Sequence, residues 1–304
     1  MKLRLRKFSP SKEGGEGIIR CFVVLIGKRN SGKTTLLRAL LNEIKDSIDL
    51  AVGFSPTDDC NAALSDIMPG SLVHREVSEQ VLRNLIDVQR DQWKDGRTGY
   101  EVALVLDDMA HERRLFDSKV FKELAYNSRH LHLTVIMTMQ YAVALGPAIR
   151  GNCDVVVTLA ERMHGNRKRL YEAFFGMTTY NEFSAILDKT TENYEALVLW
   201  NRSKSNALSD CLFWYKADMA QLDEVKLARD WTWSLHNHYA SERGGAPADE
   251  GFGKVIDSIV QADEDNQTIA KHRVIELAVP ATAPYAEGLQ DSDEYLSSEA
   301  FMMQ

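Results

Sequence analysis

The chain has 304 residues, 44% of them hydrophobic, which is enough to bury the core of one large domain or two smaller ones. Its longest apolar runs, such as CFVVLI and VALVL, are far shorter than the roughly 20 residues of a membrane-spanning helix, so no transmembrane segment is expected. The net charge is −8, but six acidic residues and no Lys or Arg follow Arg273, which leaves about −2 for the rest and excludes coating of nucleic acid by charge alone.

Residues 1–20 are predicted to form a basic arm or edge strand, because the string MKLRLRKF alternates basic with apolar residues. This string is not followed by the apolar stretch of a secretory signal, so we expect no secretion signal. The four cysteines show no CxxC spacing, which favours free thiols over zinc binding or disulfides. Cys21 and Cys153 lie in apolar runs and are expected to be buried.

Compact apolar runs bounded by polar or turn-forming residues predict strands in the first part of the chain. These runs cover residues 21–26, 49–54, 101–106, 132–138 and 154–159. Between them, KTTLLRALLNEI and SEQVLRNLIDVQRDQW repeat apolar residues with a helical period, the second after a Ser cap. The alternation predicts an α/β fold, with a mainly parallel central sheet flanked by helices.

Beyond residue 160 the sequence predicts two short helices and then strands at 195–200 and 211–215, paired as a hairpin or at an edge of the same sheet. An amphipathic helix from about Met219 to His238 would close the fold, and a weak helix at 252–276 would form a C-terminal helical extension. The core domain is therefore predicted to cover residues 21–240. Residues 241–304 have the composition of a linker, a weak helix and an acidic tail that is disordered or docks on a partner.

The string GKRNSGKT begins at Gly27 and fits the phosphate-loop pattern G-x-x-x-x-G-K-[ST], or Walker A motif, between a predicted buried strand and a helix. In such a loop backbone N–H groups wrap the phosphates, Lys33 reaches the β and γ oxygens, and the Thr34 hydroxyl coordinates Mg²⁺. No N-K-x-D guanine motif occurs in the sequence, which favours ATP over GTP. We expect ATP to contact Gly27, Lys28, Arg29, Asn30, Ser31, Gly32, Lys33, Thr34 and Thr35.

The run EVALVLDDM places two carboxylates at the tip of a predicted strand, as in a Walker B motif. We expect Asp107 to hold Mg²⁺ through its water shell and Asp108 to orient or deprotonate the attacking water. Glu112 is the alternative base. A metal acid beside a water-activating acid indicates hydrolysis, whereas the structural alternative is a plain Asp-Asp turn at a strand end.

Three further side chains are candidates for the same reaction. Gln140 ends the strand-like run HLTVIMTMQ, where its amide could sense the γ-phosphate or simply face solvent. Arg129 precedes that strand and Arg150 follows the turn GPAI. Either arginine could act on the ATP of a neighbouring subunit as an arginine finger, and a solvated surface arginine is the alternative for each.

Several strings, in order and spacing, resemble those of the poxvirus-type virion DNA-packaging ATPases of nucleocytoplasmic large DNA viruses, a branch of the FtsK-HerA superfamily. They are GKRNSGKT, LVLDDM, NSRHLHLTVIMTMQYAVALGPAIRGNCD, LDKTTENYEALVLWNRSKSN and CLFWYKA. The resemblance covers about residues 20–217, and the later strings are more specific than the phosphate loop. Asn30 in the loop and Trp200 before NRSKSN depart from the family pattern, which puts the role of the turn at 200–206 in doubt.

The resemblance implies a RecA-like core that forms a ring, expected to be a hexamer, and pumps double-stranded DNA into a preformed capsid. It implies ATP and Mg²⁺ at Lys33 and Thr34, Gln140 as sensor and Arg129 as the trans-acting finger, with Arg150 as a second candidate. It also implies a capsid or inner-membrane vertex component as partner, and a location in the virion and the host cytoplasm. Two alternatives remain: an ATP-controlled scaffold that moves nothing, and a small-molecule phosphotransferase. The paired acids and the absence of a lid-like arginine cluster in the sequence count against the phosphotransferase.

Overall fold

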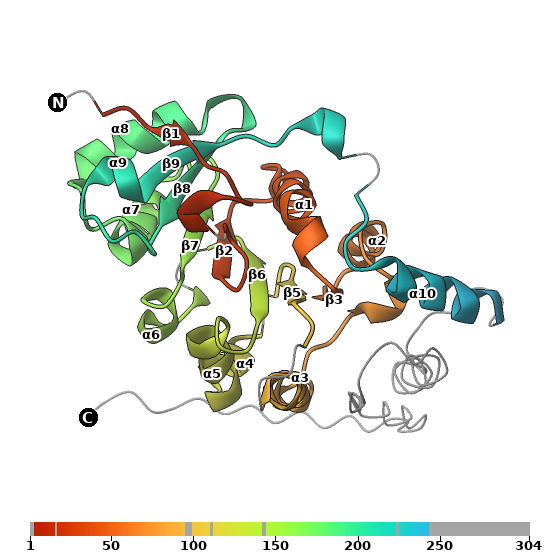
Figure 1. The fold of residues 1–304 in the computed structure, drawn as a ribbon. Helices are drawn as coiled ribbons and strands as arrows, with labels where there is room; N and C mark the ends of the chain where they lie inside the picture. The colour runs from red at the N-terminus through yellow and green to blue at the C-terminus, as the bar shows by residue number, and fades with distance from the viewer. Residues whose placement is uncertain are drawn as a thin grey trace, which may run out of the picture.

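The computed structural model describes residues 3–15, 17–94, 99–109, 112–141, 144–222 and 225–242. The predictions for the linker, weak helix and acidic tail fall on residues 243–304 and lie outside this part of the chain. Within the described part, helices pack on both faces of one central sheet (Figure 1). No described helix is long and apolar enough to span a bilayer.

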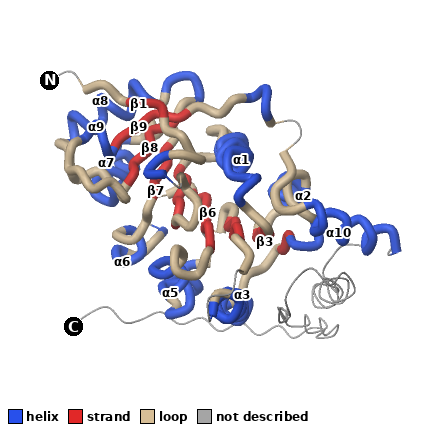
Figure 2. Tube along the Cα trace, in the orientation of Figure 1, coloured by secondary structure: helices blue, strands red, loops and turns tan. Residues whose placement is uncertain are grey.

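Nine strands form the sheet, drawn in red in Figure 2, in the spatial order β1-β9-β8-β7-β2-β6-β5-β3-β4. The strand pairs are parallel except for the two that β8 makes with β7 and β9 among the described residues. The strands are β1 Arg6–Lys7, β2 Phe22–Ile26, β3 Leu50–Phe54, β4 Val73–His74, β5 Val102–Leu106, β6 Leu133–Met139, β7 Val155–Thr158, β8 Ala196–Trp200 and β9 Leu212–Tyr215.

The helices follow the strands in chain order and cover the two faces of the sheet unequally. The α-helices are α1 Lys33–Ile44, α2 Asp58–Ser65, α3 Glu79–Gln92, α4 Arg113–Asp117, α5 Lys119–Asn127, α6 Pro147–Arg150, α7 His164–Phe174, α8 Tyr180–Thr190, α9 Leu208–Cys211 and α10 Asp230–Glu242. Short 3-10 turns cover Glu13–Gly15, Lys45–Ser47, Gly70–Leu72, Glu192–Tyr194 and Met219–Gln221. This is the α/β fold predicted from the sequence, with a mainly parallel central sheet flanked by helices.

The central strand β2 shows why most strands have continuous apolar sequences. All five of its residues are buried, because successive side chains point to opposite, equally covered faces. Phe22 and Val24 join the core beneath α3, α5, α7 and α8. Val23 and Leu25 join the core beneath α1 and α2. The thiols of Cys21 and Cys153 are buried in these two cores, as predicted.

The amphipathic helix predicted from Met219 to His238 is wrong in its first half. A 3-10 turn covers Met219–Gln221, and α10 begins only at Asp230. Between them, Leu227 is fully buried and donates its backbone N–H to the Ile67 carbonyl oxygen at 2.7 Å. The apolar residues that gave this half its helical period pack as an irregular segment against the α1 and α2 face. Tertiary packing has overridden local propensity here.

The direction of the strands places the candidate residues at two opposite edges of the sheet. Parallel strands end at a common edge, so the segments that follow β2, β5, β6 and β7 meet there. The phosphate loop, the two aspartates and Gln140 all follow these strands. Arg129 and Arg150 precede β6 and β7 and lie at the other edge. We call these the carboxyl edge and the amino edge.

Candidate nucleotide site

The phosphate loop leaves β2 at Gly27 and enters α1 at Lys33. A Cβ on Gly27 would lie 2.6 Å from Ser31 Oγ and 2.9 Å from a Leu159 methyl, so this position admits only glycine without rearrangement. Gly32 has a φ of 94° and Asn30 a φ of 58°, both in the left-handed region. The loop therefore turns back on itself and aims the N-terminus of α1 at the space above the sheet, the arrangement that binds phosphate.

Lys33 is held in the loop by a backbone oxygen. Its Nζ donates to the Lys28 carbonyl oxygen at 3.0 Å, and Ser31 Oγ donates to the same oxygen at 2.7 Å. Burial lowers the pKa of the Lys33 ammonium, and the negative charges of Asp108 and Asp107 oppose that shift. A phosphate oxygen would replace the carbonyl as a stronger, charged acceptor.

Asp107 sits at the end of β5 and is only 4% exposed. Its Oδ1 accepts from Thr138 Oγ1 at 2.5 Å, and the same Thr138 oxygen accepts from the Asp108 N–H at 3.0 Å. Burial raises the pKa of the Asp107 carboxyl, while hydrogen bonds from Thr138 and Cys60 act in the opposite direction. Thr138 on β6 thus fixes both acids at the carboxyl edge.

Asp108 and Gln140 form the second pair at this edge. Gln140 Nε2 donates to both carboxylate oxygens of Asp108 at 3.1 Å. Asp108 is half-buried and has a φ of 51°, a strained backbone for a residue other than glycine. Gln140 therefore holds the Asp108 carboxylate, which stays partly open to solvent.

The described residues fit a magnesium nucleotide. The close approach at Gly27 and the left-handed Gly32 shape a cradle for phosphates, and Lys33 has an exchangeable backbone partner. Mg²⁺ prefers one or two carboxylates together with phosphate oxygens and waters, which matches Asp107 with the exposed Thr34 in the first turn of α1. Glu112, the alternative base, lies at the N-cap of α4.

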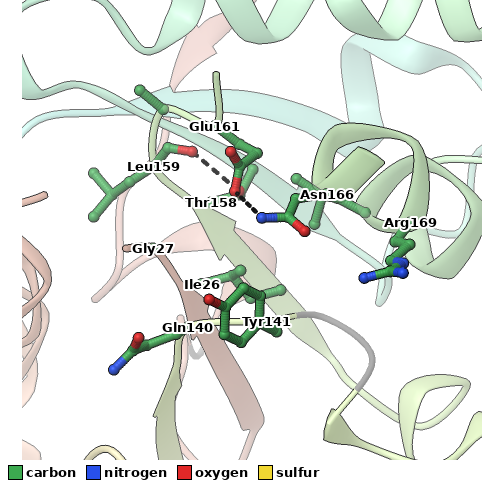
Figure 3. Close-up of a pocket in the computed structure, with 11 residues that line it drawn as sticks. Ile26, Gly27, Gln140, Tyr141, Thr158, Leu159, Glu161, Asn166 and Arg169 are labelled. Atoms are coloured by element: carbon green, nitrogen blue, oxygen red, sulfur yellow. Dashed lines mark hydrogen bonds between the residues drawn. The ribbon is translucent and has the colours of Figure 1, made fainter. Parts of the chain in front are cut away.

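A pocket opens beside the phosphate loop, between the ends of β2, β6 and β7 and the first turns of α7 (Figure 3). Gly27, Gln140 and Arg169 line it. Glu161, which follows β7, also lines it and pairs its Oε1 with Lys28 Nζ at 2.6 Å. The pocket thus adjoins the phosphate loop on the side away from Asp107.

No family model matches this sequence, but curated viral proteins do. The chain is 30% identical over 227 residues to the uncharacterized protein L437 of Acanthamoeba polyphaga mimivirus and covers 78% of it. It is 32% identical to the uncharacterized protein 088R of Invertebrate iridescent virus 3 over 78% of that protein, and 33% identical to 075L of Invertebrate iridescent virus 6 over 72%. These alignments span 71%, 69% and 60% of this chain.

The chain belongs to this viral family. Its members come from nucleocytoplasmic large DNA viruses, the group of viruses whose proteins carry the strings that this sequence resembles.

Two solved structures are also similar to this chain. One is the genome packaging NTPase B204 of Sulfolobus turreted icosahedral virus 2 in complex with ATP-gammaS, at 15% identity and a TM-score of 0.49, covering 66% of this chain and 98% of that one. The other is EssC (ATPases 2 and 3) of Geobacillus thermodenitrificans, at 10% identity and a TM-score of 0.48, covering 80% and 52%. The family assignment rests on the viral relatives.

The two arginines predicted as fingers lie at the amino edge, away from the phosphate loop of the same chain. There the Asp154 carboxylate accepts the N–H of Phe22, the first residue of β2, at 2.8 Å. Burial raises the pKa of the Asp154 carboxyl, and the Phe22 bond and the charges of Arg202 and Arg129 oppose the shift. The arrangement is compatible with a finger that acts on another subunit and not with one that acts on its own.

Three residues that contact the site were missed in the sequence. Thr138 is the second of two threonines in the buried run LTVIMTM, and its place near the end of the strand, two positions before Gln140, is the signal that could have found it. Glu161 is an acid three residues after the buried strand β7, a weaker form of the pattern at Asp107, which directly follows β5. Cys60 on α2 carries no sequence signal for its contact with Asp107.

Gly27→Ala is expected to weaken nucleotide binding by about tenfold or more, because the added methyl displaces Ser31 or Leu159 and deforms the loop. Isothermal titration with MgATPγS checks this. Gly176→Ala is the matched control, since a Cβ there meets nothing within 4 Å. Equal affinity of Gly27→Ala and wild type would contradict the cradle described above.

Proposed function

We propose that this viral protein hydrolyses ATP and uses the energy to translocate double-stranded DNA into a capsid. The observation that carries the proposal is the convergence of Lys33, Asp107, Asp108 and Gln140 at one edge of the sheet. The resemblance of its strings to those of the virion DNA-packaging ATPases supports the link to genome packaging, and its relatives are likewise viral proteins. The virion and the host cytoplasm, and a capsid or inner-membrane vertex partner, belong to the same proposal.

In the proposed mechanism each residue at the carboxyl edge has one role. ATP bound with Mg²⁺ supplies the reactive phosphoanhydride and the charge that polarises it. Lys33 exchanges the Lys28 carbonyl for phosphate oxygens, and Asp107 with Thr34 would hold the metal. Asp108 accepts the proton of the attacking water, and Gln140 holds the Asp108 carboxylate toward it.

The two edges of the sheet favour a head-to-tail ring. The carboxyl edge carries Asp107 and Asp108, and the amino edge carries Arg129 and Arg150. A contact between unlike edges of two copies is heterologous, and such contacts close into a ring when the rotation between subunits allows it. We propose that Arg129 reaches the ATP of the adjacent copy, with Arg150 as the second candidate and six subunits as the expected number.

The test is the steady-state ATPase rate with and without long duplex DNA. We expect long duplex DNA to stimulate the rate, because a motor that spends ATP on movement turns over faster with its track bound. Lys33→Ala should remove both the basal and the stimulated rate, since the phosphates lose their charged ligand. Short single-stranded DNA at the same nucleotide concentration is the control.

The other outcomes separate the alternative functions. An ATPase rate that duplex DNA leaves unchanged would contradict the motor and favour an ATP-controlled scaffold. Transfer of the γ-phosphate to a small acceptor, in place of phosphate release, would favour a phosphotransferase.

A further inference from the structure

Lys28 in the phosphate loop makes polar contacts through both its backbone carbonyl oxygen and its side-chain ammonium. Its carbonyl oxygen accepts from Lys33 Nζ and Ser31 Oγ, at 3.0 and 2.7 Å. Its ammonium reaches in the opposite direction and pairs with Glu161. Whatever fixes the Lys28 side chain therefore also fixes the carbonyl on which the phosphate-binding lysine rests.

Glu161 is the residue that fixes the Lys28 side chain. It is 8% exposed and lies three residues after the buried strand β7, which pairs with β2. Its Oε1 accepts the Met163 N–H at 2.7 Å and pairs with Lys28 Nζ at 2.6 Å, while its Oε2 accepts from Asn166 Nδ2 at 3.3 Å. Figure 3 shows the contact with Asn166, at the edge of the pocket next to Gly27.

A buried carboxylate beside a site for a triphosphate is unfavourable by charge alone. At a few ångströms, like charges in a partly buried site repel by several-fold more than in water. Burying Glu161 also costs desolvation, which its three partners offset. The N-terminus of α7 does not require a charged residue at position 161, because a neutral amide or hydroxyl there accepts the Met163 N–H equally well. The repulsion and the desolvation cost therefore need another explanation.

We propose that Glu161 is a positioning residue for nucleotide binding: it anchors Lys28 and so holds the phosphate loop in the shape that receives the triphosphate. This inference rests on the proposed ATPase function and adds a residue to it. Because the Glu161 carboxylate also holds Met163 and Asn166, the anchor ties the loop to the first turn of α7.

One substitution distinguishes a positioning role of Glu161 from a purely electrostatic one, because the two roles predict opposite changes in nucleotide affinity. Glu161→Gln removes the charge but keeps an acceptor for the Met163 N–H. If Glu161 acted only through its field, the variant would bind the anionic nucleotide more tightly. If it positions Lys28, the variant binds more weakly, by about three- to tenfold in Kd for MgATPγS. Lys28→Met should weaken binding by at least as much, because it removes the anchor and a positive charge.

The decisive measurement is the double-variant cycle, read by calorimetric titration of each purified protein with MgATPγS. In a Lys28→Met background, Glu161→Gln is expected to leave Kd unchanged or to lower it, because the anchor is already lost. Lys28→Arg should retain most of the affinity, since it keeps the ion pair. Lys168→Met on α7 is the matched control, because Lys168 pairs only at the exposed surface, with Glu172, and its Kd should equal that of wild type.

The outcomes are distinct. Tighter binding by Glu161→Gln in the wild-type background, or fully additive effects in the cycle, would overturn the positioning role. A fall in melting temperature of Glu161→Gln with no change in Kd would show a purely structural role and would overturn it as well. Failure of wild type to bind MgATPγS would instead remove the proposed ATPase function, so the two failures cannot be confused.

Discussion

Asp107→Asn is expected to abolish ATP hydrolysis and, at the same time, to raise the free energy of unfolding of the nucleotide-free protein. The loss of activity follows from the loss of the carboxylate that would hold the metal, and we expect a fall in kcat on the order of 10³-fold. The gain in stability follows from burial. Asp107 is 4% exposed, and the charged form of its carboxyl is disfavoured there.

The direction of the pKa shift fixes the pH dependence of this gain. Burial raises the pKa of Asp107 in the folded protein above its value in the unfolded chain. The folded state therefore binds the proton more tightly, and the contribution to stability is full below the unfolded pKa and is lost as pH rises through the folded pKa. Asparagine is neutral at every pH and keeps an oxygen for the Thr138 hydroxyl, so its advantage appears at neutral pH, on the order of 1 kcal/mol.

Urea unfolding of both proteins between pH 4 and 8, together with ATPase rates, checks the prediction. The stability curves of wild type and Asp107→Asn should separate as pH rises. Asp108→Asn is the control: its carboxylate is half-buried and held by Gln140, so activity should fall without a matching gain in stability. A destabilised Asp107→Asn protein at neutral pH would show that the charged form is favoured in the fold, contrary to the arrangement described above.

The sequence sufficed for the strands because most of them are buried on both faces. Runs such as CFVVLI and EVALVL are short and almost wholly apolar, which is typical of a strand buried on both faces. Their predicted bounds lie within two residues of those of β2 and β5. β4, with two residues, is too short to carry a pattern. The helix predicted for the segment before α10 was wrong because its apolar residues have helical spacing but pack as an irregular chain.

The candidate site was predictable where its residues are adjacent in sequence and not where they meet through strand register. The loop from Gly27 to Thr34 is one string. Thr138 reaches Asp107 only because Leu106 pairs with Met137 in the parallel ladder of β5 and β6. Parallel strands joined by helices leave that register undetermined by local sequence. Glu161 likewise depends on β7 lying beside β2, which chain order does not specify.

A mixture of Arg129→Ala and Asp108→Asn proteins is expected to hydrolyse ATP although each variant alone is inactive. Arg129 lies at the amino edge and Asp108 at the carboxyl edge, so one subunit's arginine can meet only another subunit's aspartate. In a ring assembled from equal amounts, a site is complete when an Arg129→Ala subunit supplies Asp108 and its neighbour supplies Arg129. Random assembly gives this in about one quarter of sites.

The recovered rate therefore measures the geometry directly. Rates near one quarter of wild type after co-refolding or subunit exchange support a finger acting in trans. An arginine acting within its own subunit gives no recovery at any mixing ratio, because every subunit then carries one lesion. The same mixture made with Arg150→Ala separates the two arginines: the one that is inactive alone and is rescued by Asp108→Asn is the finger. Because an arginine finger contributes about 10³- to 10⁵-fold, recovery stands far above the residual rates of the separate variants.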